Sequence, residues 1–154
     1  SGLIKNALDA MYSVSQEFWY LEEDAIPLLE WLYGLNYRIG LISNASDKDD
    51  VISLLNKFNL QLFFEHIIIS AEFGLRKPHP QIFLEGLRRF NVEPEKCLLV
   101  GDRLDMDIQG ANHVSIPSIW IKRRSIHTGN EDQFSAKPDF IVDTLLDIKE
   151  IVNR

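Results

Sequence analysis

The spacing of apolar residues changes repeatedly along this chain. In some stretches they recur every three or four residues, as on the buried side of a helix, and in others they form short runs typical of buried strands. The helices that we expect lie at Leu3–Phe18, from Asp24 (as N-cap, with Pro27 in the first turn) to Leu35, and at Asp47–Phe58, Pro80–Phe90, Met106–His113 and Thr144–Val152. The expected strands lie at Tyr37–Ser43, His66–Ile69, Cys97–Val100, Pro117–Ile121 and Phe140–Val142, and a long polar loop at Lys122–Pro138. The alternation predicts an α/β fold with a doubly wound, mainly parallel sheet and flanking helices.

Length and composition indicate one globular domain. The 154 residues are 45% hydrophobic and 25% charged, which is ordinary for such a domain. The net charge of −7 argues against a nucleic-acid partner, because nucleic-acid recognition normally needs a basic face. No apolar run approaches the roughly 20 residues that a membrane span needs, and no signal segment opens the chain. We therefore expect a cytoplasmic protein without a membrane partner, and the lone Cys97 to be a small buried hydrophobe.

Two acidic residues follow the predicted strand Cys97–Val100. Asp102 comes directly after Gly101 at the carboxyl end of the strand, where open α/β sheets bind their ligands. Asp107 follows five residues later in the first turn of a predicted helix, so both carboxylates face one small volume. Paired carboxylates suit a hard cation such as Mg²⁺. The alternative is that Asp102 simply caps a helix, which is a common use of aspartate.

Polar residues also follow the two preceding strands. Ser43 and Asn44 lead from one strand into a helix N-terminus, where a hydroxyl beside free backbone N–H groups makes an anion site. The same residues also suit ordinary caps and turns. Lys77 follows the next strand, and Pro78 fixes the backbone behind it. A solitary lysine in a loop is usually just solvated, so Lys77 is a candidate functional residue only in combination with the other sites.

Taken in order, these segments resemble the haloacid dehalogenase superfamily of aspartyl-phosphate hydrolases. The resemblance rests on Ser43 after an apolar strand, then Lys-Pro-x-Pro-x-Ile-Phe from Lys77, then Gly-Asp-x-x-x-x-Asp-Ile-x-Gly-Ala from Gly101. It implies a Rossmann-like fold in which Ser43 and the backbone N–H of Asn44 bind a phosphoryl group. It also implies that Lys77 neutralises the nucleophile and the phosphoryl oxygens, and that Asp102 and Asp107 hold Mg²⁺.

The family's first motif, an apolar strand ending in Asp-x-Asp, has no counterpart in this sequence. In the family that strand carries the nucleophile. It lies between two other strands, which correspond here to the strand that ends at Ser43 and the strand that precedes Asp102. We therefore expect residues 1–22 to be a linker or the remnant of a helical cap, and residues 23–154 to form a core without its first strand. The two strands flanking the missing one would pair directly, borrow a strand from a partner (a second copy included), or need a separate N-terminal piece.

Three functions are compatible with these residues. The first is a Mg²⁺-dependent phosphatase that, in its complete form, acts on a small phosphate monoester through an aspartyl-phosphate. The present chain is then expected to be inactive alone. The second is a non-catalytic module with an interaction or structural role. The third is a metal-independent haloacid dehalogenase, against which Asp102 and Asp107 argue, because such enzymes typically lack this pair of acids.

Overall fold

The computed structural model describes residues 19–124 and 135–153. The predicted helix at Leu3–Phe18, most of the predicted cap remnant and the middle of the long polar loop lie outside the described residues. The principal helices are α2 (Ala25–Gly34), α3 (Lys48–Lys57), α4 (Ser70–Phe73), α5 (Pro80–Phe90), α6 (Gln109–His113) and α7 (Ile148–Val152). Further helical turns occur at η1 (Gln61–Phe63), η2 (Pro94–Lys96), η3 (Leu104–Ile108) and η4 (Lys122–Arg124). None of these helices is long and apolar enough to span a membrane within the described part of the chain.

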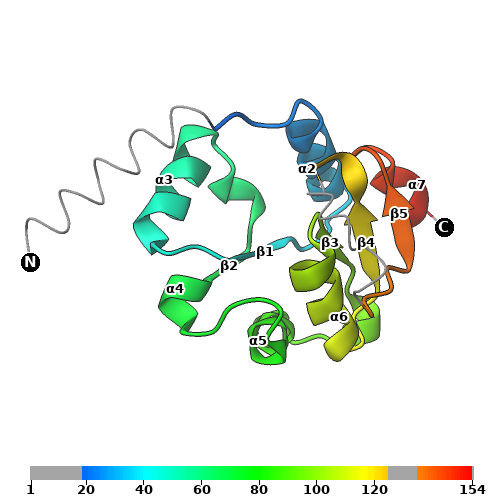
Figure 1. Cartoon of the computed structure of the whole chain (residues 1–154). Helices are drawn as coiled ribbons and strands as arrows, with labels where there is room; N and C mark the ends of the chain where they lie inside the picture. Colours follow the sequence, from blue (N-terminus) through cyan, green and yellow to red (C-terminus); the bar gives the residue numbers. More distant parts are fainter. Residues whose placement is uncertain (1–18, 125–134, 154) are drawn as a thin grey trace, which may run out of the picture.

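The strands form two parallel sheets rather than one. They are β1 (Gly40–Ser43), β2 (His66–Ile69), β3 (Leu99–Gly101), β4 (Ser118–Ile121) and β5 (Phe140–Val142). The first sheet pairs β1 with β2, and the second has the order β3-β4-β5. Figure 1 shows the two sheets side by side, with β1 and β3 as neighbours across a gap. Parallel strands joined through helices confirm the predicted α/β class, but direct pairing of β1 with β3 does not occur in the described residues.

Two hydrophobic cores lie on opposite sides of the sheets. The first gathers around α5 and α6, and Ile42 of β1 and Leu99 of β3 both pack against it, so it connects the two sheets. A Cβ on Gly110 would come within 2.1 Å of the Phe83 ring, so only glycine lets α6 approach α5 this closely. The second core joins α2 and α7 to β4 and β5, with Ile119 fully buried. Cys97 packs against the first core as a small hydrophobe, but it is only half-buried rather than buried as predicted.

Several predicted boundaries are correct. β2, α5 and β5 begin and end where the sequence pattern places them. The Nδ1 of His79 accepts a hydrogen bond from the backbone N–H of Gln81, so this side chain caps the N-terminus of α5. Asp47 caps α3 in the same way through Asp49.

Other boundaries differ from the prediction. β1 begins at Gly40 rather than Tyr37, and β3 covers Leu99–Gly101 rather than Cys97–Val100. The helix predicted from Met106 begins two residues earlier as the π-helical turn η3. α7 begins at Ile148, because Thr144 and Asp147 hydrogen-bond each other's backbone in a turn before it. Asp24 precedes α2, but its side chain does not cap that helix. Its carboxylate accepts hydrogen bonds from Arg123 and from the backbone N–H of Leu145 instead.

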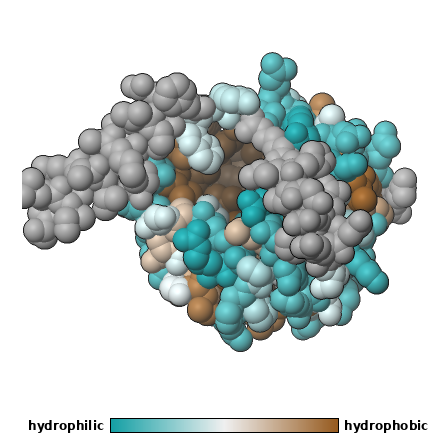
Figure 2. Space-filling model, viewed as in Figure 1, coloured by the Kyte–Doolittle hydropathy of each residue, from teal (hydrophilic) through white to brown (hydrophobic). Residues whose placement is uncertain are grey.

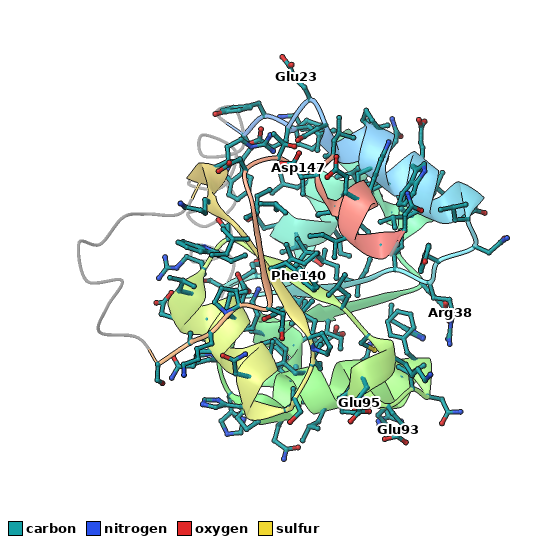
Figure 3. All side chains as sticks on the ribbon, turned by 90° about the vertical axis from the view of Figure 1, so that its right-hand side faces the viewer. Glu23, Arg38, Glu93, Glu95, Phe140 and Asp147 are labelled. Carbon is teal, nitrogen blue, oxygen red and sulfur yellow. The ribbon has the colours of Figure 1, made fainter. Side chains whose placement is uncertain are left out.

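Glu93 and Glu95 show the direction of the second sheet. They precede β3 in the chain and point into solvent at the end of the molecule opposite Glu23 (Figure 3). Since β3 runs away from them, its carboxyl end lies towards the segment around Glu23. A cavity lined by both Glu22 and Asp102 agrees with this placement.

Candidate active site

Gly101 allows Asp107 to fold back against the end of β3. After the strand, the chain turns through η3, where the backbone N–H of Asp107 donates to the carbonyl of Arg103 at 2.8 Å. A Cβ on Gly101 would lie 2.3 Å from the Cβ of Asp107, closer than two such atoms can come. Gly101 is therefore needed for packing, because the absence of a side chain there leaves room for Asp107 beside Asp102.

Lys77 lies between β1 and Asp107. Its ammonium is 2.6 Å from Oδ1 of Asp107 and donates to the carbonyl of Ile42 at 2.9 Å. The two side chains are only 16% and 7% exposed, so this ion pair is largely shielded from water. The second oxygen of Asp107 accepts the backbone N–H of Arg103 at 3.1 Å. The structure thus brings together two of the predicted site residues that lie thirty positions apart in the sequence.

Asp102 occupies the end of β3 beside this ion pair. Burial raises the pKa of its carboxyl above the ordinary aspartate value, and the nearby charge of Asp107 raises it further. Its backbone carbonyl accepts a hydrogen bond of 3.1 Å from the indole Nε1 of Trp120 on β4. The Asp107 carboxylate packs against Gly101, directly before Asp102 in the chain, so the two acids lie in one small region.

Ser43 is the last residue of β1, and a short loop connects it to α3. The side chain of the next residue, Asn44, does not face an open anion site. Its amide forms two hydrogen bonds with the backbone of Lys77 instead. Only the backbone of Asn44 therefore fits the predicted phosphate-binding role.

Sequence reasoning missed Ser70 and Trp120. Ser70 is buried at the start of α4, and its hydroxyl contacts both backbone polar groups of Ala45. The guanidinium of Arg103 pairs with both carboxylate oxygens of Asp105, so it does not point freely towards a substrate. The position of Ser70 directly after an apolar strand was a weak sign of a role in the sequence. The contact of Trp120 with Asp102 could not be predicted, because it arises only from the order of the strands in the folded sheet.

The donor set at the end of β3 fits a hard cation. Asp102 and Asp107 supply carboxylate oxygens, which Mg²⁺ prefers, and this metal usually keeps several water ligands as well. Within residues 19–124 and 135–153, no group of three His, Cys, Asp or Glu side chains gathers to hold a metal ion. The two acids therefore form an incomplete ligand set that water and further groups would complete.

Comparison with known proteins agrees with this arrangement. Residues 2–121 match the family model described as haloacid dehalogenase-like hydrolase. The chain belongs to this family. The matched region contains Ser43, Lys77, Asp102 and Asp107, so the site described above lies within the family's shared core.

Several relatives of the chain are named phosphatases. It is 33% identical over 143 residues to a glyceraldehyde 3-phosphate phosphatase of Methanopyrus kandleri, covering 90% of this chain and 60% of the relative. It is 41% identical over 108 residues to a protein of the same name from Pyrococcus abyssi, covering 69% of this chain and 45% of the relative.

A solved structure with a similar fold is a HAD phosphatase from Thermococcus onnurineus. The TM-score is 0.74 at 30% sequence identity, and the match covers 86% of this chain and 58% of that one. The chain thus spans between 45% and 60% of the length of these three proteins.

Proposed function

We propose that this chain is the core of a Mg²⁺-dependent phosphatase that acts on a small phosphate monoester. The observation that carries the proposal is that the loop after Ser43, the Lys77 ammonium and the Asp107 carboxylate meet at the carboxyl ends of β1 and β3, where Asp107 packs against Gly101 beside Asp102. A phosphoryl group is negative in its ground and transition states, so it needs fixed positive partners. Since the net charge of the chain is −7, those partners have to be local. The names of the relatives support a small phosphorylated substrate.

Each residue has a distinct role in this proposal. Asp102 and Asp107 would hold Mg²⁺, which when bound neutralises charge on the phosphoryl oxygens. The Ser43 hydroxyl and the backbone N–H of Asn44 bind the phosphoryl oxygens at the beginning of α3. Lys77, positioned by Asp107 and the carbonyl of Ile42, supplies a fixed positive charge. Neither a nucleophile nor an acid for the leaving oxygen is among these residues.

The open edges of β1 and β3 suggest where the nucleophile would come from. In a parallel strand, successive residues direct their backbone groups to opposite sides. The backbone carbonyl of Ile39 accepts a hydrogen bond from the backbone N–H of Glu65, just before β2. Ile42 lies three residues later, so its backbone groups point to the opposite side, away from β2 and towards β3. The backbone N–H of Leu99 donates to the carbonyl of Pro117, just before β4. The backbone groups of the next residue, Val100, therefore point to the opposite side, into the gap. We propose that a further parallel strand fills this gap and ends in Asp-x-Asp beside Lys77.

Apolar surface beside the gap supports an apolar strand. Leu98 and Val100 lie on one face of the β3 segment and are 37% and 41% exposed, although both are large hydrophobic residues. A cavity of about 260 Å³ adjoins Val100, and the side chains of Val100, Ile121 and Leu145 line part of its wall. Figure 2 shows a hydrophobic hollow on the face that looks towards the viewer in Figure 1. An added strand would pair with the backbone of Val100 that faces the gap and would cover these side chains.

Complementation tests both parts of the proposal. The purified chain is assayed with p-nitrophenyl phosphate and Mg²⁺, alone and with a peptide of five apolar residues followed by Asp-x-Asp. We expect no hydrolysis by the chain alone and Mg²⁺-dependent hydrolysis with the peptide, because the peptide supplies the nucleophile and the proton donor. A peptide ending in Asn-x-Asn should bind without restoring hydrolysis, and Lys77→Ala should abolish the restored activity.

The outcomes separate this proposal from the alternatives. Hydrolysis by the chain alone that disappears in Asp102→Asn would show that the nucleophile lies within these residues. Binding of the peptide without hydrolysis of any phosphate ester in a broad panel would favour a non-catalytic module. Metal-independent release of halide from a haloacid would favour a dehalogenase, against which the pairing of Asp102 with Asp107 argues.

A further inference from the structure

We propose that the side chains of Asn44 and Ser70 are positioning residues that fix the loop after β1 against Lys77. Each of them binds both the backbone N–H and the backbone carbonyl of one residue in a different segment. The catalytic meaning of this inference rests on the proposed function. The contacts themselves, and the test below, do not depend on activity.

Asn44 joins the loop after β1 to the Lys77 segment. Its Oδ1 accepts the backbone N–H of Lys77 at 2.8 Å, and its Nδ2 donates to the carbonyl of the same lysine at 3.0 Å. Nδ2 also lies 3.6 Å from Sδ of Met106, next to Asp107 in the chain. An asparagine amide has two N–H donors, and these two contacts occupy both. The side chain therefore positions Lys77 and is not available to bind a phosphoryl group.

Ser70 holds the same loop from the other side. Its hydroxyl accepts the backbone N–H of Ala45 at 3.1 Å and donates to the carbonyl of Ala45 at 3.0 Å. The residue is only 4% exposed, so water does not compete with these bonds. Because Ala45 follows Asn44, fixing the Ala45 backbone also fixes the point from which the Asn44 amide reaches Lys77.

Together the contacts determine where the Lys77 ammonium lies. The flexible stem of a lysine places its charge reproducibly only when both ends are held. Asn44 holds the backbone of Lys77, while Asp107 and the carbonyl of Ile42 hold its ammonium. In an enzyme, a displacement of about 1 Å at such a group can lower the rate about 100-fold. Asn44 and Ser70 would therefore affect turnover without touching the substrate.

Nuclear magnetic resonance of the ¹⁵N-labelled chain tests the proposal. We expect Asn44→Ala and Ser70→Ala to shift the ¹⁵Nζ signal of Lys77 and to raise hydrogen exchange of its ammonium at least about tenfold, because the lysine loses its fixed backbone. Ser70→Thr, which keeps the hydroxyl, should retain the wild-type signal. If Ser70→Thr behaves like Ser70→Ala, the hydroxyl is not what positions the loop and the assignment of Ser70 is wrong.

The chain contains a matched control for each variant. Asn112 bonds the backbone N–H and carbonyl of Lys137 at 2.8 and 3.0 Å, the same arrangement as that of Asn44 with Lys77 but outside the site. Ser118 is a fully buried serine bonded to Asp139. Asn112→Ala and Ser118→Ala should lower the free energy of unfolding and leave the Lys77 signal unchanged.

Two results overturn the inference. One is an unchanged Lys77 signal in folded Asn44→Ala, and the other is an equal change in Asn112→Ala. Neither result bears on whether the completed protein hydrolyses phosphate esters. Conversely, failure of the complementation assay with normal Lys77 signals would overturn the proposed function and leave the positioning role in place.

Discussion

The ammonium of Lys77 lies 2.6 Å from the carboxylate of Asp107, in an ion pair whose acidic partner is only 7% exposed. Replacing Lys77 with methionine would leave a buried carboxylate without its counter-charge. We expect the free energy of unfolding to fall by about 3 kcal/mol, as for other buried pairs that lose one partner. Urea denaturation at neutral pH measures this loss. The control is Lys48→Met, which breaks an exposed pair with Glu72 and should cost less than about 1 kcal/mol. Equal losses in the two variants would contradict the shielding of the Lys77–Asp107 pair.

Gly101→Ala should distort the candidate metal site. The added Cβ would lie 2.3 Å from the Cβ of Asp107, so the turn that carries this acid has to move. We expect a loss of about 1–3 kcal/mol in the free energy of unfolding, as in other overpacked sites. Gly34→Ala is the control, because a Cβ there meets nothing within 4 Å and alanine favours the helix. A Gly101→Ala protein as stable as Gly34→Ala would show that η3 adjusts freely.

Asp24 should make the protein sensitive to acid. Its hydrogen bonds with Arg123 hold its pKa below the ordinary value of 3.8. The unfolded chain therefore binds a proton more readily, so the stabilisation is complete above pH 3.8 and is lost as the pH falls through the lowered pKa. We expect Asp24→Asn to lower the free energy of unfolding by about 1–2 kcal/mol at pH 7, and this difference to shrink below pH 3.8. Urea denaturation from pH 7 to pH 3 measures the difference, and a constant difference across that range would reject the ion pair as its source.

Trp120 should report metal binding at Asp102. Its indole donates to the Asp102 carbonyl at 3.1 Å, whereas the other two tryptophans, Trp19 and Trp31, precede β1. With both of those changed to phenylalanine, we expect Mg²⁺ to alter the fluorescence of Trp120 in a saturable way, because the ion changes the charge beside the indole. Asp102→Asn should abolish the response. If Asp102→Asn gives the same fluorescence titration with Mg²⁺, the metal binds at another site.

The sequence by itself determined the order of the elements and the identity of the chemical groups. β2, α5 and β5 were predictable to the residue, because apolar runs and helical spacing within a short segment decide such elements. The sequence also showed that Ser43, Lys77 and Asp102 follow three successive strands. Since parallel strands end at the same edge of a sheet, their convergence could be expected before any coordinates.

The tertiary structure alone decided which groups touch. Asn44 and Lys77 are 33 residues apart, and a hydrogen bond from a side chain to a distant backbone leaves no periodic trace in a sequence. For the same reason the sequence could not show that Asp24 bonds Arg123 rather than capping α2. The division into two sheets also depends on distant segments: β3 finds its partner in β4 and β1 in β2, and no strand in the described residues joins them. Local patterns determine elements, whereas pairing and side-chain contacts depend on which segments the folded chain brings together.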